Sequence, residues 1–227
     1  MDDALLIVVA YLVGAFPFVY LLGRLRGYDL RKEEDMHLSM WRKVGRVEGV
    51  IVIIWEVLKG TAVVLVARYT LDSETWAVAC AGVAVVAGQM WSVFLGFSGE
   101  KGNSTGLGMA SALAIRALPF AAVPILAGVI SKMIASLRDR NKSVRERWDF
   151  KGSATLSMPI GMLVGFAVFP IASAALGLSW WISASLLVLL VLILVKRATD
   201  GVRADLKTAT NKRSIIINRL LYDRSYK

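Results

Sequence analysis

Cysteine and histidine are almost absent from this sequence, which contains one of each, Cys80 and His37. A single cysteine excludes a disulfide within the chain, and because Cys80 lies in an apolar stretch we expect a small core residue rather than a thiol nucleophile. His37 lies in a charged stretch, where we expect an exposed and neutral imidazole. No metal site and no cofactor is predicted. Acidic residues are also few, 17 against 27 basic ones, which leaves a net charge of +10.

Long polar segments are equally rare, because 56% of the residues are hydrophobic and most of them lie in uninterrupted blocks. A membrane-spanning helix needs about 20 apolar residues to cross a hydrocarbon core of roughly 30 Å. In lipid only helices or closed barrels satisfy the backbone polar groups, and the alternation typical of barrel strands is missing. The sequence therefore predicts an all-α polytopic membrane protein with spans near residues 4–23, 50–69, 76–97, 154–172 and 178–195.

The stretch from Gly106 to Leu137 could form one long helix or two short helices that turn back at Arg116–Pro119. Charge distinguishes the two, because the cytoplasmic loops of membrane proteins carry an excess of Lys and Arg. Basic residues gather in three segments, and only two short helices, near 104–117 and 119–137, place all three segments on one side. We therefore expect about seven transmembrane helices, with the N-terminus outside and the C-terminus cytoplasmic. The basic segments are 24–46, 132–151 and 196–227.

These spans are expected to form a single membrane-embedded domain over residues 1–227. Its cytoplasmic parts are the loops 24–49, 98–103 and 138–153 and the tail 196–227. The first apolar block has no basic segment before it, so we expect it to be retained and not cleaved as a signal peptide. The expected location is the plasma membrane, with membrane lipids as partners. The excess of basic residues is explained by cytoplasmic loops that lie near anionic headgroups, so no nucleic-acid partner is expected. The sequence does not indicate a particular protein partner.

A glycine-rich segment, GFSGEKGNSTGLG from Gly96 to Gly108, interrupts the apolar sequence on the expected cytoplasmic side. Glycine lets the backbone approach a ligand closely, and the N–H groups at a helix N-terminus favour an anion. Lys101 adds a positive charge, and the next span begins with three polar side chains that can donate hydrogen bonds, Asn103, Ser104 and Thr105. The spacing differs from that of a Walker A loop. The segment is either a phosphate-binding loop or a tight turn between helices.

A second polar feature, WEVLKG from Trp55 to Gly60, lies within an apolar span. Glu56 and Lys59 are three residues apart and therefore share one helical face. Ionisable residues inside a span are costly and usually face the bundle interior, where they pair or bind a substrate. The two residues either contribute to a site or neutralise each other and fix helix packing.

Three stretches carry a family resemblance: GAFPFVYLLGRLRGYDLR (14–31), WEVLKG (55–60) and AGQMWSVFLGFSGEKGNSTGLG (87–108). In order and spacing the sequence resembles the bacterial acyl-phosphate glycerol-3-phosphate acyltransferases of the PlsY type. The resemblance covers about the first 110 residues, and beyond them only the number of helices agrees. It implies seven transmembrane helices, an external N-terminus and an active site at the cytoplasmic face.

The resemblance also implies a reaction. A fatty acyl group would pass from acyl phosphate to glycerol 3-phosphate, giving lysophosphatidate, without a nucleophilic residue of the protein. Positioning two phosphates and offsetting their repulsion would supply much of the catalysis. By position in the family motifs, one phosphate would be held by Lys101 and the backbone amides of Gly99 to Asn103, and the other by Arg42. Further matches to the family are Gly99, Gly102, Thr105 and Lys59, with Glu56 in place of the usual aspartate.

Four departures from the family pattern affect the expected site. KEEDMHLSMW (32–41) replaces a loop rich in glycine, serine and asparagine, so that acidic residues occupy an expected anion-binding loop. Gln89 replaces the histidine that follows a glycine at the end of the third span. Glu100 replaces a loop glycine, and RSIII (213–217) replaces a polar C-terminal motif.

Two hypotheses follow from this mixture of retained and altered residues. The first is a divergent membrane acyltransferase that acts on glycerol 3-phosphate or a related acceptor. The second is a catalytically silent homologue that binds lipid or another membrane component. Lys101, Arg42 and the VLKG sequence favour the first hypothesis, whereas the acidic residues at 33–35 and Glu100 favour the second.

Overall fold

The computed structural model describes residues 2–33, 35–138, 157–208 and 212–223. These residues form helices, and the nearest approach to a strand among them is one isolated bridge between Ser92 and Ser98. The expected loop 138–153 lies outside the described residues from position 139 onward. The helices are α1 (Asp3–Ala15), α2 (Phe18–Leu25), η1 (Leu30–Lys32), α3 (Met36–Ser39), η2 (Met40–Val44), α4 (Arg46–Leu65), η3 (Val66–Thr70), α5 (Thr75–Met90), η4 (Val93–Leu95), α6 (Asn103–Leu113), α7 (Leu118–Arg138), α9 (Ser157–Ala175), α10 (Trp180–Thr199), α11 (Val202–Thr208) and α12 (Lys212–Tyr222).

Among the described residues, five helical segments are long and apolar enough to cross a membrane. They are Asp3–Leu25, Arg46–Thr70, Leu118–Ala135, Ser157–Ala175 and Trp180–Thr199, and α5 is a shorter apolar helix. Many large apolar side chains on these helices are exposed, as expected for surfaces that face lipid and not water. The expectation of an all-helical membrane protein is therefore confirmed.

Several helix boundaries differ from the expected spans for local reasons. The first span is divided into α1 and α2 at Phe16 and Pro17, because proline has no N–H group to continue the helical hydrogen bonds. The third helix, α5, ends at Met90, and the chain continues through the short turn η4. The chain reverses direction between Leu113 at the end of α6 and Leu118 at the start of α7.

Glycines allow three pairs of helices to pack with their backbones in contact. A Cβ atom on Gly88 of α5 would lie 2.1 Å from the carbonyl oxygen of Tyr11 in α1, and one on Gly108 of α6 would lie 2.1 Å from that of Val57 in α4. The pair α7 and α9 uses Gly161 in the same way, against the carbonyl oxygen of Pro124 at 2.6 Å. Small residues at such crossings are the usual way in which membrane helices approach closely.

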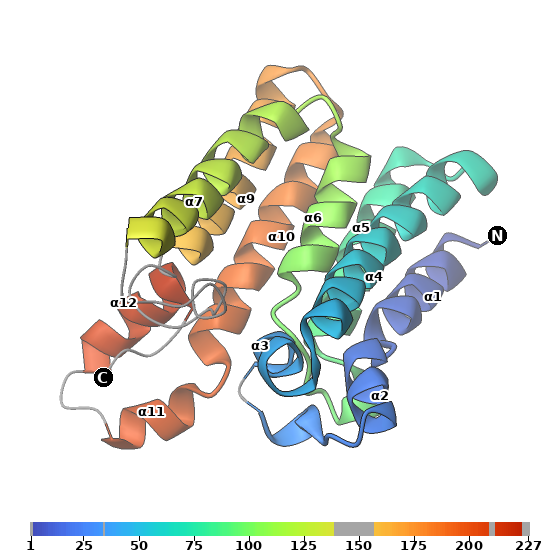
Figure 1. Ribbon diagram of the computed structural model, residues 1–227. Coiled ribbons are helices and arrows are strands. Elements are labelled where there is room, and N and C mark those ends of the chain that lie inside the picture. The colour runs from blue at the N-terminus through green and yellow to red at the C-terminus, as the bar shows by residue number, and fades with distance from the viewer. Residues whose placement is uncertain (1, 34, 139–156, 209–211, 224–227) are drawn as a thin grey trace.

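The short helices gather at one end of the bundle (Figure 1). Figure 1 shows α2, α3, α11 and α12 at this end, beside the loop that connects α5 to α6, whereas the turn between α6 and α7 lies at the opposite end. The close pairing of α4 with α6 brings the polar face of α4 to the N-terminus of α6. The polar segments that the sequence singles out therefore meet at one end of the molecule.

Candidate functional site

A cavity of about 980 Å³, here called the chamber, opens at the end of the bundle where α3, the loop before α6 and the C-terminal helices meet. Charged side chains of both signs line it, and they come from segments far apart in the sequence. Such a mixture at the mouth of an apolar bundle is typical of a site for a polar ligand. The charged lining residues include Asp35, His37, Arg42, Glu56, Glu100, Lys101, Arg197 and Asp223.

The loop before α6 follows the end of α5 closely. Gly99 has no room for a side chain, because a Cβ atom there would lie 2.2 Å from the carbonyl oxygen of Gln89. The backbone N–H of Glu100 donates to the same oxygen at 3.1 Å. Gly102 caps α6 in a left-handed conformation with φ of 71°, which glycine adopts without strain. These contacts fix the backbone on both sides of Lys101.

Lys101 reaches into the chamber and contacts two carboxylates. Its Nζ lies 2.9 Å from Oδ2 of Asp223 and 3.2 Å from Oδ2 of Asp35. It also donates to the backbone oxygen of Asp223 at 3.3 Å. Burial alone would lower the pKa of Lys101, but the charges of Asp223 and Asp35 outweigh it and raise the pKa above the usual value. Lys101 is therefore a fixed positive charge.

The acidic residues of the altered loop already have partners. Glu33 pairs with Lys43 at 2.5 Å and accepts a hydrogen bond from Ser39 at 2.9 Å. Asp35 caps α3 by accepting from the N–H of Leu38 at 2.9 Å. Burial would raise the pKa of Asp35, but Lys101 and His37 lower it to about 2, so its carboxylate stays charged. The third acid of the run, at position 34, lies outside the described residues.

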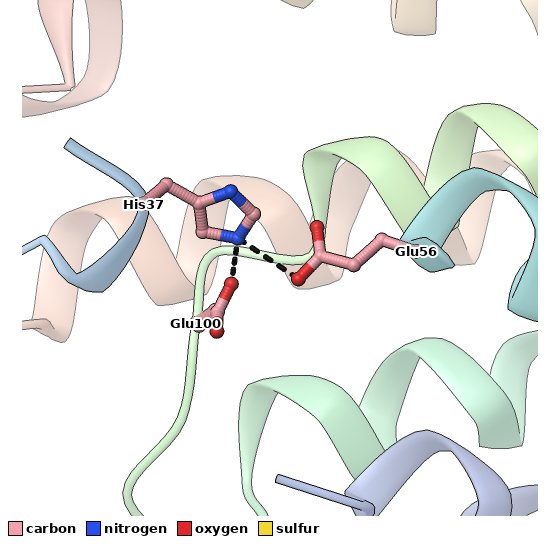
Figure 2. Close-up of side chains that lie close together, drawn as sticks. All are labelled: His37, Glu56 and Glu100. Atoms are coloured by element: carbon pink, nitrogen blue, oxygen red, sulfur yellow. Dashed lines mark ion pairs between the residues drawn. The ribbon is translucent and has the colours of Figure 1, made fainter. Parts of the chain in front are cut away.

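His37 is not the exposed and neutral residue that the sequence suggested. Its Nε2 lies 2.9 Å from Oε1 of Glu56 and also contacts Oε2 of Glu100, as Figure 2 shows. Its side chain retains 28% of its exposure, whereas that of Glu56 retains 2%. The imidazole therefore bridges a carboxylate from α4 and one from the loop before α6. The short helix α3 carries it to this position.

The two carboxylates determine the charge of the imidazole. Burial by itself would lower the pKa of His37, but the charges of Glu100 and Glu56 raise it to about 10. Burial and the charge of Glu56 raise the pKa of Glu100 well above its usual range. The imidazole is thus protonated at neutral pH and supplies the positive charge that the two carboxylates share.

A hydrogen-bonded framework lies behind this cluster. Gln89 at the end of α5 donates from Nε2 to Oε1 of Glu56 at 2.5 Å and to Oε2 of Glu100 at 3.4 Å. The fully buried hydroxyl of Thr105 donates to Oε1 of Gln89. Lys59 is turned the other way and donates to the carbonyl oxygen of Gly14 at 3.0 Å. Glu56 and Lys59 thus take different partners, one toward the chamber and one toward α1.

The residues expected from the sequence therefore fall into two groups. Gly99, Lys101, Gly102, Asn103 and Ser104 line the chamber, together with Arg42 and Glu56. Lys59, Gln89 and Thr105 do not line it: Gln89, supported by Thr105, holds Glu56 and Glu100 in place, whereas Lys59 contacts Gly14 of α1. Asn103 has one further property, because its Oδ1 is buried without a hydrogen-bond partner in the structure. An amide oxygen in this state is an available acceptor for a hydroxyl group.

Two lining residues were missed by the sequence reasoning, Arg197 and Asp223. Arg197 lies in the last turn of the apolar helix α10. Its side chain is fully buried and does not extend to the membrane surface. Asp223 follows α12 at the end of the described chain. Their approach depends on how the C-terminal helices fold back on α9 and α10, and a single sequence does not show that. The one signal for Arg197 is a cation at the end of an apolar span.

The cluster in Figure 2 is also the place where the described residues could hold a metal ion. One donor atom from each of His37, Glu56 and Glu100 lies within 4.8 Å of the others. Imidazole nitrogen and carboxylate oxygen are ligands that zinc accepts. The chemistry of the donors fits, but a metal ion would have to replace the proton of the imidazole, because histidine binds a metal only in its neutral form.

The fold and the chamber together define a class, a helical multi-pass membrane protein with a charged site at one end of its bundle. Comparison with known proteins is more specific. The family model described as glycerol-3-phosphate acyltransferase matches residues 4–204. The chain therefore belongs to the glycerol-3-phosphate acyltransferase family.

Named relatives agree with this assignment. A glycerol-3-phosphate acyltransferase of Geobacter sulfurreducens is 37% identical over 112 residues, which are 48% of this chain and 57% of the relative. The corresponding protein of Desulforamulus reducens is 36% identical over 141 residues, 60% of this chain and 70% of the relative. Glycerol-3-phosphate acyltransferase 4 of Dehalococcoides mccartyi is 28% identical over 225 residues, 97% of this chain and 88% of the relative. The chain thus covers little more than half the length of the Geobacter relative.

Two solved structures share the fold. Both are crystal structures of PlsY, an integral membrane glycerol 3-phosphate acyltransferase, one in its lysophosphatidic acid form and one in its glycerol 3-phosphate form. Each superimposes with a TM-score of 0.66 over 100% of this chain, covering 95% and 96% of PlsY, at 23% and 24% identity. At this identity the likeness concerns the fold.

Proposed function

We propose that this protein transfers a fatty acyl group from acyl phosphate to glycerol 3-phosphate and so makes lysophosphatidate for phospholipid synthesis. The observation that carries the proposal is the position of Lys101, a fixed cation beside the N-terminus of α6, on the wall of a chamber large enough for two polar substrates. Family membership and the named relatives support the same reaction.

The proposed chemistry needs no cofactor. A hydroxyl oxygen of glycerol 3-phosphate attacks the acyl carbonyl carbon, the bond from that carbon to the phosphate oxygen breaks, and the departing phosphate takes the hydroxyl proton. One carbon–oxygen bond forms as another breaks, so the reaction is balanced without an acyl-enzyme. The protein would contribute orientation and positive charge, which act where two anions must approach each other.

The roles of individual residues follow from their place around the chamber. Lys101 and the backbone amides from Gly99 to Asn103 would hold one phosphate, with Ser104 as a further donor, and Arg42 would hold the other. Asn103 Oδ1 would accept a hydrogen bond from a glycerol hydroxyl, because this buried oxygen has no hydrogen-bond partner in the part of the chain that the structure describes. The positions of Glu56 and Glu100 would be maintained by Thr105 and Gln89, and Lys59 would support the site indirectly by holding α4 against α1.

The arrangement in the membrane is part of the proposal. Besides the five long apolar segments, α5 and α6 would complete seven crossings, forming a single domain with an external N-terminus and a cytoplasmic tail. The chamber would then face the cytoplasm at the inner surface of the plasma membrane, where the basic loops lie near anionic headgroups. Water-soluble glycerol 3-phosphate would enter from the cytoplasm, and the acyl chain would remain among membrane lipids.

One observation favours the second candidate, a catalytically silent homologue that binds lipid or supports other membrane proteins. Lys101 is already paired with two carboxylates, and a phosphate must displace at least one of them to bind. If this displacement is too costly, the fold persists without the reaction.

Acyl transfer by the full-length protein in lipid decides between the two. The purified protein is supplied with acyl phosphate and labelled glycerol 3-phosphate, and wild type is compared with Lys101→Ala and with Lys207→Ala, an exposed lysine of α11. Labelled lysophosphatidate from wild type and Lys207→Ala, but not from Lys101→Ala, is the expected result. No product from a monodisperse wild-type sample, beside an active family member, would support the silent homologue.

A further inference from the structure

The carboxylate of Asp223 lies between two cations of the chamber. One oxygen, Oδ2, is 2.9 Å from Nζ of Lys101, and the other, Oδ1, is 3.9 Å from Nε of Arg197. The three residues come from the loop before α6, from the last turn of α10 and from the end of α12. A single anionic group thus bridges two positive charges that are 96 positions apart in the chain (197 − 101).

Arg197 is held rigidly by its outer nitrogens. Its side chain is fully buried, Nη1 donates to the carbonyl oxygens of Pro159 at 3.3 Å and Leu220 at 3.2 Å, and Nη2 donates to that of Pro159 at 3.4 Å. Only Nε lacks a hydrogen bond to any of the described residues, and Asp223 is too far away to accept one. A buried charged donor in this state is costly unless something accepts from it.

We infer that Lys101 and Arg197 form a binding subsite for a phosphate group of a substrate, and that Asp223 competes with the substrate for this subsite. A phosphate has three terminal oxygens that accept hydrogen bonds, so one can face Lys101 while another fills the 3.9 Å gap to Arg197 Nε, which the carboxylate spans without a hydrogen bond. The inference rests on the proposed function in one respect, the assignment of Lys101 to a substrate phosphate.

Arg197 is oriented for this role in a way that Arg42, which the sequence assigns to the other phosphate, is not. Arg42 is exposed on η2, whereas Arg197 is oriented by carbonyl groups of two other helices before any ligand arrives. A cation oriented in advance loses less freedom when it binds. Asp223 is also well placed to leave, because it follows the last residue of α12 in a left-handed conformation with φ of 59°. The side chain can turn away without unfolding a helix.

Binding of inorganic phosphate, measured by titration calorimetry on the full-length protein in detergent without an acyl donor, tests the inference. Asp223→Asn keeps the shape of the side chain and removes its charge, so we expect the affinity for phosphate to rise by about tenfold, which corresponds to about 1.4 kcal/mol. Asp72→Asn is the matched control, because Asp72 is exposed, has a left-handed conformation like that of Asp223 with φ of 47°, and does not line the chamber, so the affinity should stay unchanged. Glycerol 3-phosphate should respond like inorganic phosphate, and uncharged glycerol should not.

The contribution of Arg197 is measured in the background of Asp223→Asn. Adding Arg197→Lys keeps a positive charge but removes Nε, and it should abolish most of the gain. An affinity that is unchanged or weaker in Asp223→Asn, or a gain that survives Arg197→Lys, overturns the inference. If Arg197→Lys does not fold, the comparison of Asp223→Asn with Asp72→Asn still tests the inference.

The same measurements separate this inference from the proposed function. If Asp223→Asn binds phosphate more tightly but the wild-type protein transfers no acyl group, the subsite is supported and the proposed reaction is contradicted. Conversely, the enzyme could be active while Asp223→Asn changes neither its phosphate affinity nor its KM for glycerol 3-phosphate. That result would support the proposed reaction and contradict the competition by Asp223.

Discussion

His37 and Gln89 meet at one oxygen atom: His37 Nε2 lies 2.9 Å and Gln89 Nε2 lies 2.5 Å from Oε1 of Glu56. Gln89 stands where the family resemblance leads us to expect a histidine. The imidazole that is missing at position 89 is therefore supplied from α3, at a carboxylate that both side chains share. The altered loop and the altered end of α5 thus meet at one carboxylate, that of Glu56.

The bridge between the carboxylates predicts a coupling between His37 and Glu100. His37→Gln leaves two neighbouring carboxylates without their cation and should lower the free energy of unfolding by about 1–3 kcal/mol. In the double variant His37→Gln, Glu100→Gln the loss should be smaller than the sum of the single losses, by about 1 kcal/mol. Chemical denaturation in detergent measures the cycle. Lys43→Gln, at an exposed ion pair, should cost less than about 1 kcal/mol, and strict additivity would contradict the bridge.

The same cluster predicts how stability changes with pH. The pKa of His37 is about 10 in the folded protein, against 6.5 for an ordinary imidazole. Its stabilising contribution is therefore complete below pH 6.5 and disappears as the pH rises through 10. Thermal midpoints of wild type and His37→Gln should converge over this interval. A difference between the two proteins that stays constant across it would show that the imidazole is not held by charge.

The pKa of Asp35 is shifted in the opposite direction, so Asp35 affects stability at low pH. Its pKa is lowered from 3.8 to about 2, so its contribution is present above pH 3.8 and is lost as the pH falls toward 2.

Helix packing predicts a sharp contrast between two glycines of α5. Gly88→Ala would push a methyl group to 2.1 Å from the backbone oxygen of Tyr11, which cannot move without shifting α1. It should destabilise the protein by about 1–3 kcal/mol. The corresponding change Gly82→Ala meets side chains and no backbone, Met109 at 2.9 Å and Leu113 at 3.4 Å, and the better helix propensity of alanine offsets part of that cost. Thermal melting of both variants measures the difference, and equal losses would contradict the backbone contact.

Lys59 and Lys101 should differ in kinetics. Lys101→Ala removes a cation from the chamber and should lower kcat/KM for glycerol 3-phosphate by about 10- to 100-fold. Lys59→Met removes the donor to the Gly14 carbonyl oxygen and should lower stability while leaving the KM for glycerol 3-phosphate nearly unchanged. Steady-state acyl transfer with both variants checks this. A large rise in KM for Lys59→Met would place its charge within the substrate site.

Cysteine labelling can test the proposed topology, because Cys80 is the only native cysteine. In a Cys80→Ala background, Arg116→Cys before α7 and Arg138→Cys at its end replace exposed residues. A reagent that does not cross membranes should label position 116 in intact cells and position 138 only after permeabilisation. Labelling of both positions from the same side would exclude a crossing by α7.

The helical membrane class and the family could be predicted from the sequence because they depend on local features. Uninterrupted apolar blocks determine the class, and the motifs around WEVLKG and the glycine-rich loop indicate the family. The positions of His37, Arg197 and Asp223 depend instead on tertiary packing. His37 reaches Glu56 and Glu100 only because α3 packs against α4. Asp223 lies 122 positions from Lys101 (223 − 101) and meets it only in the folded chain. A lone histidine in a charged segment carries no local sign of such partners.

The shortness of α6 has a consequence for how a substrate with one water-soluble and one oily part can be handled. Its 11 residues extend over about 16 Å, roughly half the thickness of a hydrocarbon core. If its C-terminal end lies near the opposite membrane surface, its N-terminus lies within the thickness of the bilayer. The loop with Lys101 precedes that N-terminus, so this side of the chamber would lie deeper than the lipid headgroups. A phosphate could then stay solvated at the same depth at which the first carbons of an acyl chain enter the bilayer. The lipid need not be lifted out of the membrane for its head to be modified.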